Sequence, residues 1–374
     1  MRGLLLLLVC LSFIFTSPAT ARQRDDVPIL KPEQEELMRQ SLHALREGKT
    51  NDAFALALRA VRSDPTNYLG FRFRGQLREA TREFDLCVAD YTLAIQQAPT
   101  KSSLYLMRAR ALFKGGRIDE SILDWTHFIE TEKDALKAPE LFDFGIANVI
   151  VGKLDVARKQ FEWYATLYPD DVENAAWQFL CVAKKEGIVA ARAQLLKVGK
   201  DDRQPMMALY GVFKGEGTIA DVWNAVGAGK PAEAERVQRE FWARLYLGLY
   251  FEADGRANLA ARYLNTAALM ASPTLFTNQT VFYMTDVARV YHDKLRTREL
   301  KELNAAIDAD PENQKARNLA LWLALNILVC IGWLLFRVSK KIQPQKKPSV
   351  TEPIVTATAS LVKTEEQKVE PVKV

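Results

Sequence analysis

The chain has 374 residues, of which 48% are hydrophobic and 26% charged, enough for one large domain or an elongated repeat array with a real core. Its four cysteines are too sparse for a disulfide framework. The formal net charge is +5, but basic and acidic residues are equal in number over 22–318, and this neutral middle excludes DNA and RNA as partners.

The N-terminus has the pattern of a secretory signal peptide. Arg2 precedes an apolar run over 4–15, and small residues at 19–21 provide a cleavage site. The apolar run is too short to span a bilayer comfortably. We therefore predict a signal peptide over 1–21, followed by a linker over 22–33.

Prolines close helical stretches at a regular spacing in the middle of the chain. Pro65 and Pro99 are 34 residues apart, and Pro169 follows after about two more such periods. This period is typical of the tetratricopeptide repeat, a hairpin of two helices. No alternating β-branched run bounded by turn residues occurs over 22–318. We predict an all-α fold, a right-handed superhelical solenoid of tetratricopeptide repeats over 34–300.

Small residues recur where the two helices of each hairpin would cross. Only Gly, Ala, Ser or Cys fits at a close crossing, and a large residue on the facing helix fills the remaining space. The matching residues are Ala53 and Ala60; Gly75, Cys87, Tyr91 and Ala94; Ala109, Ser121, Trp125 and Phe128; Gly145, Gly152, Ala157 and Phe161; and Gly248, Gly255, Ala260, Leu264 and Ala267. They place units near 34–67, 68–101, 102–137, 138–171 and 241–273.

The repeat pattern weakens between the fourth unit and the last. Residues 172–205 read as a degenerate unit, and 206–238 as an insert with two shorter helices. After Pro273 we predict a helix over 274–300 that caps the array, since terminal repeats are atypical.

A second apolar run, Leu319–Phe336, contains no charged residue. As a helix it would be about 27 Å long, which suits the hydrocarbon core of a bilayer, although a buried core helix is the alternative. Trp322 and Trp333 lie near its ends, and the heavier positive charge follows it, which favours a cytosolic C-terminus. We predict a juxtamembrane segment over 301–318, a single transmembrane helix over 319–336 and a disordered cytosolic tail over 337–374.

The irregular fifth unit and the segment that reopens the array form a distinctive pattern within 34–272. It consists of Tyr168-Pro169-Asp170-Asp171, Trp177, Tyr210, Gly217-Thr218, Tyr246-Leu247-Gly248-Leu249-Tyr250 and Leu259-Ala260-Ala261. In these residues the chain resembles the NlpI-type tetratricopeptide lipoproteins of bacterial envelopes. It departs from them in its added C-terminal span and in lacking a lipid-attachment motif, because Val9 stands before Cys10 where a small residue is required.

The resemblance implies a bacterial source and an adaptor role. Members of that group resemble adaptors that bring a periplasmic protease or wall hydrolases together. With the predicted topology, the expected location is the cell membrane, with the repeat domain in the periplasm and a short tail in the cytosol.

The sequence contains no motif for catalysis or metal binding. His43, His127 and His292 are scattered, and none lies near a cysteine or a paired carboxylate in sequence. Adjacent acids such as Asp170-Asp171 and Asp201-Asp202 would point apart on a helix, so we interpret them as helix caps or loop ends. We predict no enzyme activity, no cofactor and no metal.

Cys87 and Cys181 are the only cysteines of the predicted exported domain. They belong to the second and fifth units, and a solenoid unit contacts only its neighbours, so a disulfide between them is geometrically implausible. We predict two buried free thiols.

The concave face, lined by the first helix of each hairpin, is the candidate partner-binding surface. Its inward-pointing residues are Arg72, Gln76, Leu106, Arg110, Phe113, Lys114, Phe142, Ile146 and Val149. A basic entrance beside an apolar floor would hold an extended or helical peptide with a carboxylate near Arg72 and Arg110. The alternative is that these are solvated arginines and residues packed on the neighbouring unit.

Two classes of function remain open. The first is a membrane-anchored, non-enzymatic adaptor that binds other envelope proteins through the concave face, or recruits a cytosolic partner through its tail. The second is a wall-active hydrolase or other enzyme with a site in the 199–230 insert. Its candidate acids are Asp201, Asp202, Glu216 and Asp221, with Arg203. Burial and convergence of these side chains would distinguish the classes.

Overall fold

The computed structural model describes residues 28–132, 141–270 and 279–341, and every regular element within these segments is a helix. The predicted all-α class is therefore confirmed. The chain divides into two compact units, residues 1–302 and residues 303–374. The predicted signal peptide and most of the predicted tail lie outside the described segments.

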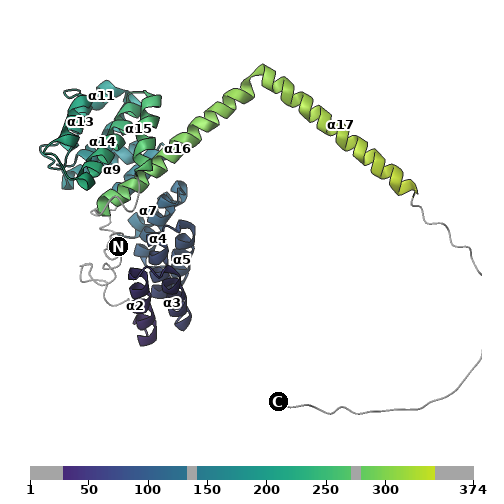
Figure 1. The fold of residues 1–374 in the computed structure, drawn as a ribbon, viewed down its shortest axis with the longest axis horizontal. Helices are drawn as coiled ribbons and strands as arrows, with labels where there is room; N and C mark the ends of the chain where they lie inside the picture. The colour runs from purple at the N-terminus through teal and green to yellow at the C-terminus, as the bar shows by residue number, and fades with distance from the viewer. Residues whose placement is uncertain (1–27, 133–140, 271–278, 342–374) are drawn as a thin grey trace, which may run out of the picture. The chain divides into compact units, whose positions relative to one another are not determined.

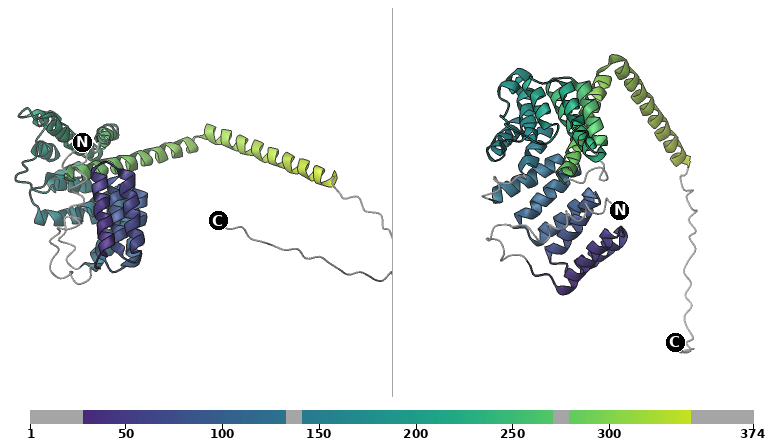
Figure 2. Two further views of the ribbon diagram at one scale, coloured as in Figure 1. Left: turned by 60° about the horizontal axis from the view of Figure 1, so that its bottom comes forward. Right: turned by 60° about the vertical axis from the view of Figure 1, so that its left-hand side comes forward.

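Consecutive hairpins of two helices open the first unit (Figure 1). They pair α2 (Pro32–Arg46) with α3 (Thr50–Ser63), α4 (Tyr68–Ala80) with α5 (Phe84–Gln97), α6 (Ser102–Lys114) with α7 (Ile118–Thr131), and α8 (Leu141–Ile150) with α9 (Leu154–Leu167). Each hairpin also packs on the next, so the helices stack side by side, as two further views show (Figure 2).

A small residue facing a large one sets the crossing inside the hairpins. A Cβ atom added at Gly75 would lie 2.7 Å from Cε1 of Tyr91, closer than real Cβ contacts allow. The same distance separates a Cβ at Gly145 from Phe161 and one at Gly248 from Leu264. The pairing of small and large residues predicted from the sequence is thus present in three hairpins.

Buried ion pairs join the two helices of the second and third hairpins at equivalent positions. Arg74 of α4 binds Asp90 of α5 at 2.5 Å, and Arg108 of α6 binds Asp124 of α7 at 2.7 Å. Arg78 adds a second cation to Asp90 at 2.8 Å. Because both carboxylates are buried, these paired cations are needed to offset their desolvation.

The second half of the first unit is organised around α10 (Val172–Glu186), which is buried over most of its length and packs against helices on several sides. The following helices are α11 (Ile188–Ala193), α12 (Met206–Lys214), α13 (Ile219–Gly227), α14 (Glu233–Ala253) and α15 (Ala257–Leu269). The two short helices predicted for the insert are α12 and α13.

Helix α16 (Gln279–Ala309) differs from the predicted cap over 274–300 in both length and position. It continues beyond residue 300, and its first half contacts several hairpins rather than only the end of the array. Tyr283 lies on Phe113 of α6, and Tyr291 lies against Trp177 of α10. The cause is an apolar face that is buried against the repeats, formed by Met284, Val287, Ala288, Val290, Tyr291 and Leu295.

The second unit contains the end of α16 and helix α17 (Pro311–Lys341), where the sequence predicts a juxtamembrane segment and a span. Apolar side chains of α17 are exposed along its length, from Leu319 to Trp333. Among the residues whose surroundings are described, none of the helices is both long and apolar enough to cross a bilayer. Residues 334–336, the end of the predicted span, are outside that set.

The small-residue crossing can be tested at Gly75. We expect Gly75→Ala to lower the free energy of unfolding by about 1–3 kcal/mol, because the new methyl group collides with the Tyr91 ring. Chemical denaturation followed by circular dichroism measures this loss. Gly227→Ala is the matched control, since a Cβ there has no neighbour within 4 Å. Equal stability of the two variants would contradict the packing argument.

Candidate functional site

The first helices of successive hairpins, α4, α6 and α8, carry the residues predicted for the concave face, and we call the surface they share the first-helix face. The structure divides these residues into two groups. Arg72, Gln76, Leu106, Arg110, Lys114 and Phe142 are half-buried, whereas Phe113, Ile146 and Val149 are buried in the core. The last three cannot form an exposed apolar floor, because neighbouring helices already cover them.

Arg110 already has a carboxylate partner within the chain, whereas the sequence predicted one from a bound peptide. Its Nε lies 3.3 Å from the Asp143 carboxylate at the start of α8. Burial raises the pKa of Asp143, while the Arg110 guanidinium opposes that rise. The Phe142 ring packs within its own hairpin, against Phe161 and Tyr164 of α9.

Lys114 is held by a residue that the sequence analysis missed. Its Nζ lies 2.8 Å from Glu79 Oε1, and the Tyr91 hydroxyl donates to the other Glu79 oxygen at 3.0 Å. Burial opposes ionisation of Glu79, but the Lys114 ammonium outweighs it and lowers the pKa of that carboxyl. Glu79 follows Gln76 by about one helical turn, which is the signal that could have placed it on this face.

Arg72 is the exception on this face. Its guanidinium forms no hydrogen bond or ion pair with any residue of the described segments, and its Nε is buried without an acceptor. Burial lowers the pKa of Arg72, and no carboxylate counters this effect. One turn further along α4, the Gln76 side-chain oxygen is also buried without a partner.

Helix α16 contacts the ends of α4 and α6 that lie away from Arg72. Tyr283 lies on Phe113, with ring centroids 6.2 Å apart, and Lys114 Nζ is 5.9 Å from the Tyr283 ring. Asp286 binds Arg82, just after α4, at 2.5 Å and Arg289 at 3.3 Å. We call this region, Phe113 and Lys114 with Tyr283 and Asp286, the covered half of the first-helix face. Arg72, Gln76 and Leu106 form its open half.

The acids proposed as an alternative catalytic set do not converge. Asp202 is exposed and pairs with Lys200 at 3.0 Å, and exposed Glu216 pairs with Lys214 at 2.7 Å. Asp221 accepts from the Thr218 backbone N–H at 2.8 Å and so completes the cap of α13. Each of these acids therefore has a local structural partner of its own.

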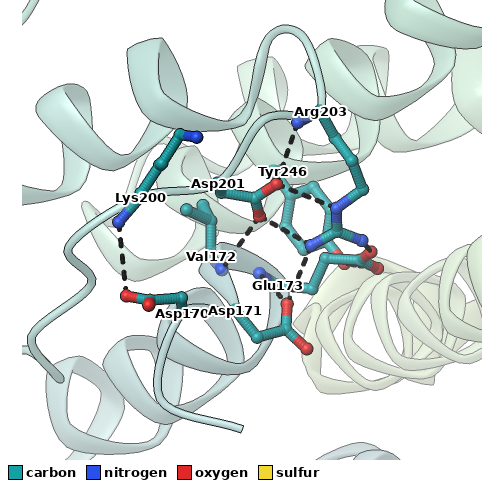
Figure 3. A network of polar contacts seen from close by, with 8 residues as sticks. All are labelled: Asp170, Asp171, Val172, Glu173, Lys200, Asp201, Arg203 and Tyr246. Carbon is teal, nitrogen blue, oxygen red and sulfur yellow. Dashed lines mark hydrogen bonds and ion pairs between the residues drawn. The ribbon is translucent and has the colours of Figure 1, made fainter.

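The remaining members, Asp201 and Arg203, belong to a different network at the start of α10 (Figure 3). Arg203 binds Asp201 at 2.6 Å, Asp171 at 3.0 Å and also Glu173. Tyr246 of α14 donates to the other Glu173 oxygen at 2.6 Å. The network joins α10, the 199–205 loop and α14, and both Glu173 oxygens are already bound. Its role in the structure is to fix these segments together.

Adjacent acids at the loop ends act as the sequence predicts. Asp171 caps α10 by accepting from the Glu173 backbone N–H at 3.0 Å. Asp170 accepts from the backbone N–H groups of Gly199 and Lys200 at 2.7 and 3.2 Å. Both carboxylates thereby satisfy backbone donors that would otherwise lack a partner.

Cys87 and Cys181 are both free and fully buried, so the predicted core thiols are confirmed. Burial raises the pKa of Cys181 to about 12 and that of Cys87 further, which leaves both thiols protonated at neutral pH. In the described part of the chain, no group of three or more His, Cys, Asp or Glu side chains could hold a metal ion.

A shallow cavity of about 450 Å³ lies elsewhere, between α2 and α3. Arg39, His43, Asp52 and Arg59 are among the residues that line it. None of the residues predicted for the concave face contributes to its lining, and its charges are of both signs. We therefore base the candidate site on the first-helix face rather than on this cavity.

Comparison with known proteins gives matches of fold only. No family model and no curated protein sequence matches the chain. A tetratricopeptide repeat protein from Parabacteroides merdae is 14% identical, with a TM-score of 0.46. The match covers 70% of this chain and 99% of that protein's chain. PilW, described as a widely conserved type IV pilus biogenesis factor, is 12% identical, with a TM-score of 0.39, covering 64% of this chain and 94% of its own.

A third solved structure, YrrB, described as a tetratricopeptide repeat protein with an unusual peptide-binding site, is 12% identical, with a TM-score of 0.33. It covers 60% of this chain and 95% of its own. The predicted resemblance to NlpI-type lipoproteins finds no support among these three matches.

Glu173 provides a test of the Arg203 network. Burial raises its pKa from 4.5 to about 7, although Arg203 opposes the shift. A carboxyl with a raised pKa stabilises the fold most when protonated, so its contribution is present below pH 4.5 and is lost as the pH rises to about 7. The expected loss of unfolding free energy is about 3 kcal/mol.

The measurement is the free energy of unfolding at pH 5 and pH 8 for the natural chain and for Glu173→Gln. The variant cannot titrate at this position, so its stability should fall less between the two pH values. Other titrating groups are common to both proteins and cancel in the difference. Identical changes in the two proteins would show that Glu173 is ionised across this range.

Proposed function

We propose that the protein is a non-enzymatic adaptor that binds another protein through the open half of its first-helix face. The observation that carries this proposal is that, within the described segments, neither the guanidinium of Arg72 nor the side-chain oxygen of Gln76, one turn along α4, has a partner. A binding partner that supplies an acceptor would remove the desolvation penalty that the free protein bears. The fold supports the same role, because stacked helical hairpins present extended surfaces for binding proteins.

The arrangement of the acids favours an adaptor over the alternative of a hydrolase in the 199–230 insert. Asp202, Glu216 and Asp221 are exposed and separately paired, and Asp201 is bound by Arg203. Convergent acids with a free oxygen are needed for general acid–base hydrolysis. We therefore assign no catalytic residue.

The proposal extends to a membrane-anchored protein of the bacterial envelope. The uncharged run Leu319–Phe336 and the exposed apolar side chains of α17 support an anchor at this position. The apolar run and small residues within 1–21 support export of the repeats. Partners in the envelope, including a protease or wall hydrolase, follow from the resemblance alone.

Partner binding is tested by crosslinked pull-down of the full-length protein beside Arg72→Glu, with circular dichroism to show that the variant remains helical. We expect the specifically enriched proteins to decrease at least tenfold in the variant, because the reversed charge repels their carboxylate. Arg262→Glu is the matched control, since Arg262 is exposed on a second helix, α15. Partners retained by Arg72→Glu would move the binding surface elsewhere.

Membrane anchoring is tested by alkaline carbonate extraction of membranes from cells that express the full chain. We expect the protein to remain in the pellet, and a variant ending at residue 310 to move to the supernatant. The shortened variant keeps all the repeat helices, so its folding serves as the control. Extraction of the full chain by carbonate would contradict the proposed anchor.

A further inference from the structure

The covered half of the first-helix face shows how this surface binds a helix. Helix α16 places an aromatic ring, Tyr283, on Phe113, and a buried carboxylate, Asp286, on the guanidinium of Arg82. The two residues of α16 are three positions apart and therefore lie on the same side of the helix. An apolar contact with an adjacent acid–arginine pair is thus the chemistry by which this face holds its own helix.

Four arginines lie in or just after α4, and three of them have a carboxylate partner. Arg74 and Arg78 bind Asp90, and Arg82 binds Asp286. Arg72 has no such partner in the described segments, although its Nε is buried. A partly buried cation without a counter-ion opposes folding, so a carboxylate from outside the described segments would relieve this cost.

The first-helix face also carries apolar and amide side chains at repeat positions near that of Arg72. In the next hairpin, 34 residues later, the position equivalent to Arg72 is Leu106, a half-buried apolar side chain. Gln76, one turn along α4, has a side-chain oxygen that is buried without a partner. The Arg72 guanidinium and the Gln76 amide suit a carboxylate, and the apolar side chain of Leu106 suits the apolar side of an amphipathic helix.

We propose that the open half of the first-helix face binds an amphipathic helix of a partner protein through an aspartate or glutamate side chain that pairs with Arg72. This inference rests on the proposed adaptor function and names the chemistry of its partner.

The first test compares two arginines of the same helix in the full-length protein without a partner. Arg72→Met removes an uncompensated charge, so we expect the melting temperature to rise by roughly 2 °C or more. Arg74→Met leaves the buried Asp90 with one cation fewer, so the melting temperature should fall. A fall for Arg72→Met as large as that for Arg74→Met would show that Arg72 serves the fold and would overturn the proposal.

The second test uses a peptide with the sequence of residues 283–295, acetylated and amidated at its ends, which carries Tyr283 and Asp286 as α16 does. Its twin contains Asn in place of Asp286. Fluorescence anisotropy with the full-length protein should give at least tenfold tighter binding for the Asp peptide, as expected for a charge-assisted hydrogen bond. Arg72→Met should abolish that preference.

Two outcomes would overturn the inference. Equal binding of the two peptides, or a preference lost in Arg82→Met but kept in Arg72→Met, would show that the peptide only replaces α16. A third peptide would contain Asn in place of Asp286 and a free C-terminal carboxylate. If it binds as tightly as the Asp peptide, the site recognises the C-terminus of a partner rather than an acidic side chain. If the pull-down partners still depend on Arg72, the adaptor function stands even when this inference fails. If neither the pull-down partners nor the peptide preference depends on Arg72, the adaptor function and this inference both fail.

Discussion

The close crossing of two helices within each hairpin is the constraint on which the rest of the structure depends. Gly75, Gly145 and Gly248 each leave space for one large side chain of the facing helix, and no Cβ fits there. At Gly75 this contact brings α4 and α5 close enough for Arg74 to reach Asp90. Tyr91 links this packing to the binding surface, because the same ring that fills the space at Gly75 donates its hydroxyl to Glu79.

The local part of this architecture could be predicted from the sequence, because it depends on short spacings. The helical class, the small-to-large pairing and the two buried thiols all follow from residues within one repeat. The path of α16 could not be predicted, since its contacts with Arg82 and Phe113 join residues far apart in the chain. The same limit applies to Arg110, whose partner Asp143 belongs to the next hairpin, and to Arg203, whose partner Glu173 lies 30 residues earlier in the chain.

Charge on the first-helix face is compensated almost everywhere within the described segments. Lys114 neutralises Glu79, Arg110 neutralises Asp143, and Asp286 lies between Arg82 and Arg289. The pairs follow one another from hairpin to hairpin and end at α16, which supplies the last carboxylate. Arg72 stands out against this background, and the proposal of a partner with an acidic side chain follows from the contrast rather than from the number of basic residues.

The position of α16 also affects how the domain unfolds. One hydrophobic core runs continuously from Ala109 to Leu295, whereas the first two hairpins contain smaller separate clusters. In a simple solenoid each unit contacts only its neighbours, so unfolding can begin at either end. Here α16 ties the C-terminal repeats into one continuous core, and its Asp286 also binds Arg82 of the second hairpin, so we expect fraying to begin at α2 and α3. Arg72 on α4 thus lies between the end that we expect to fray and this core, where a bound helix would add to local stability.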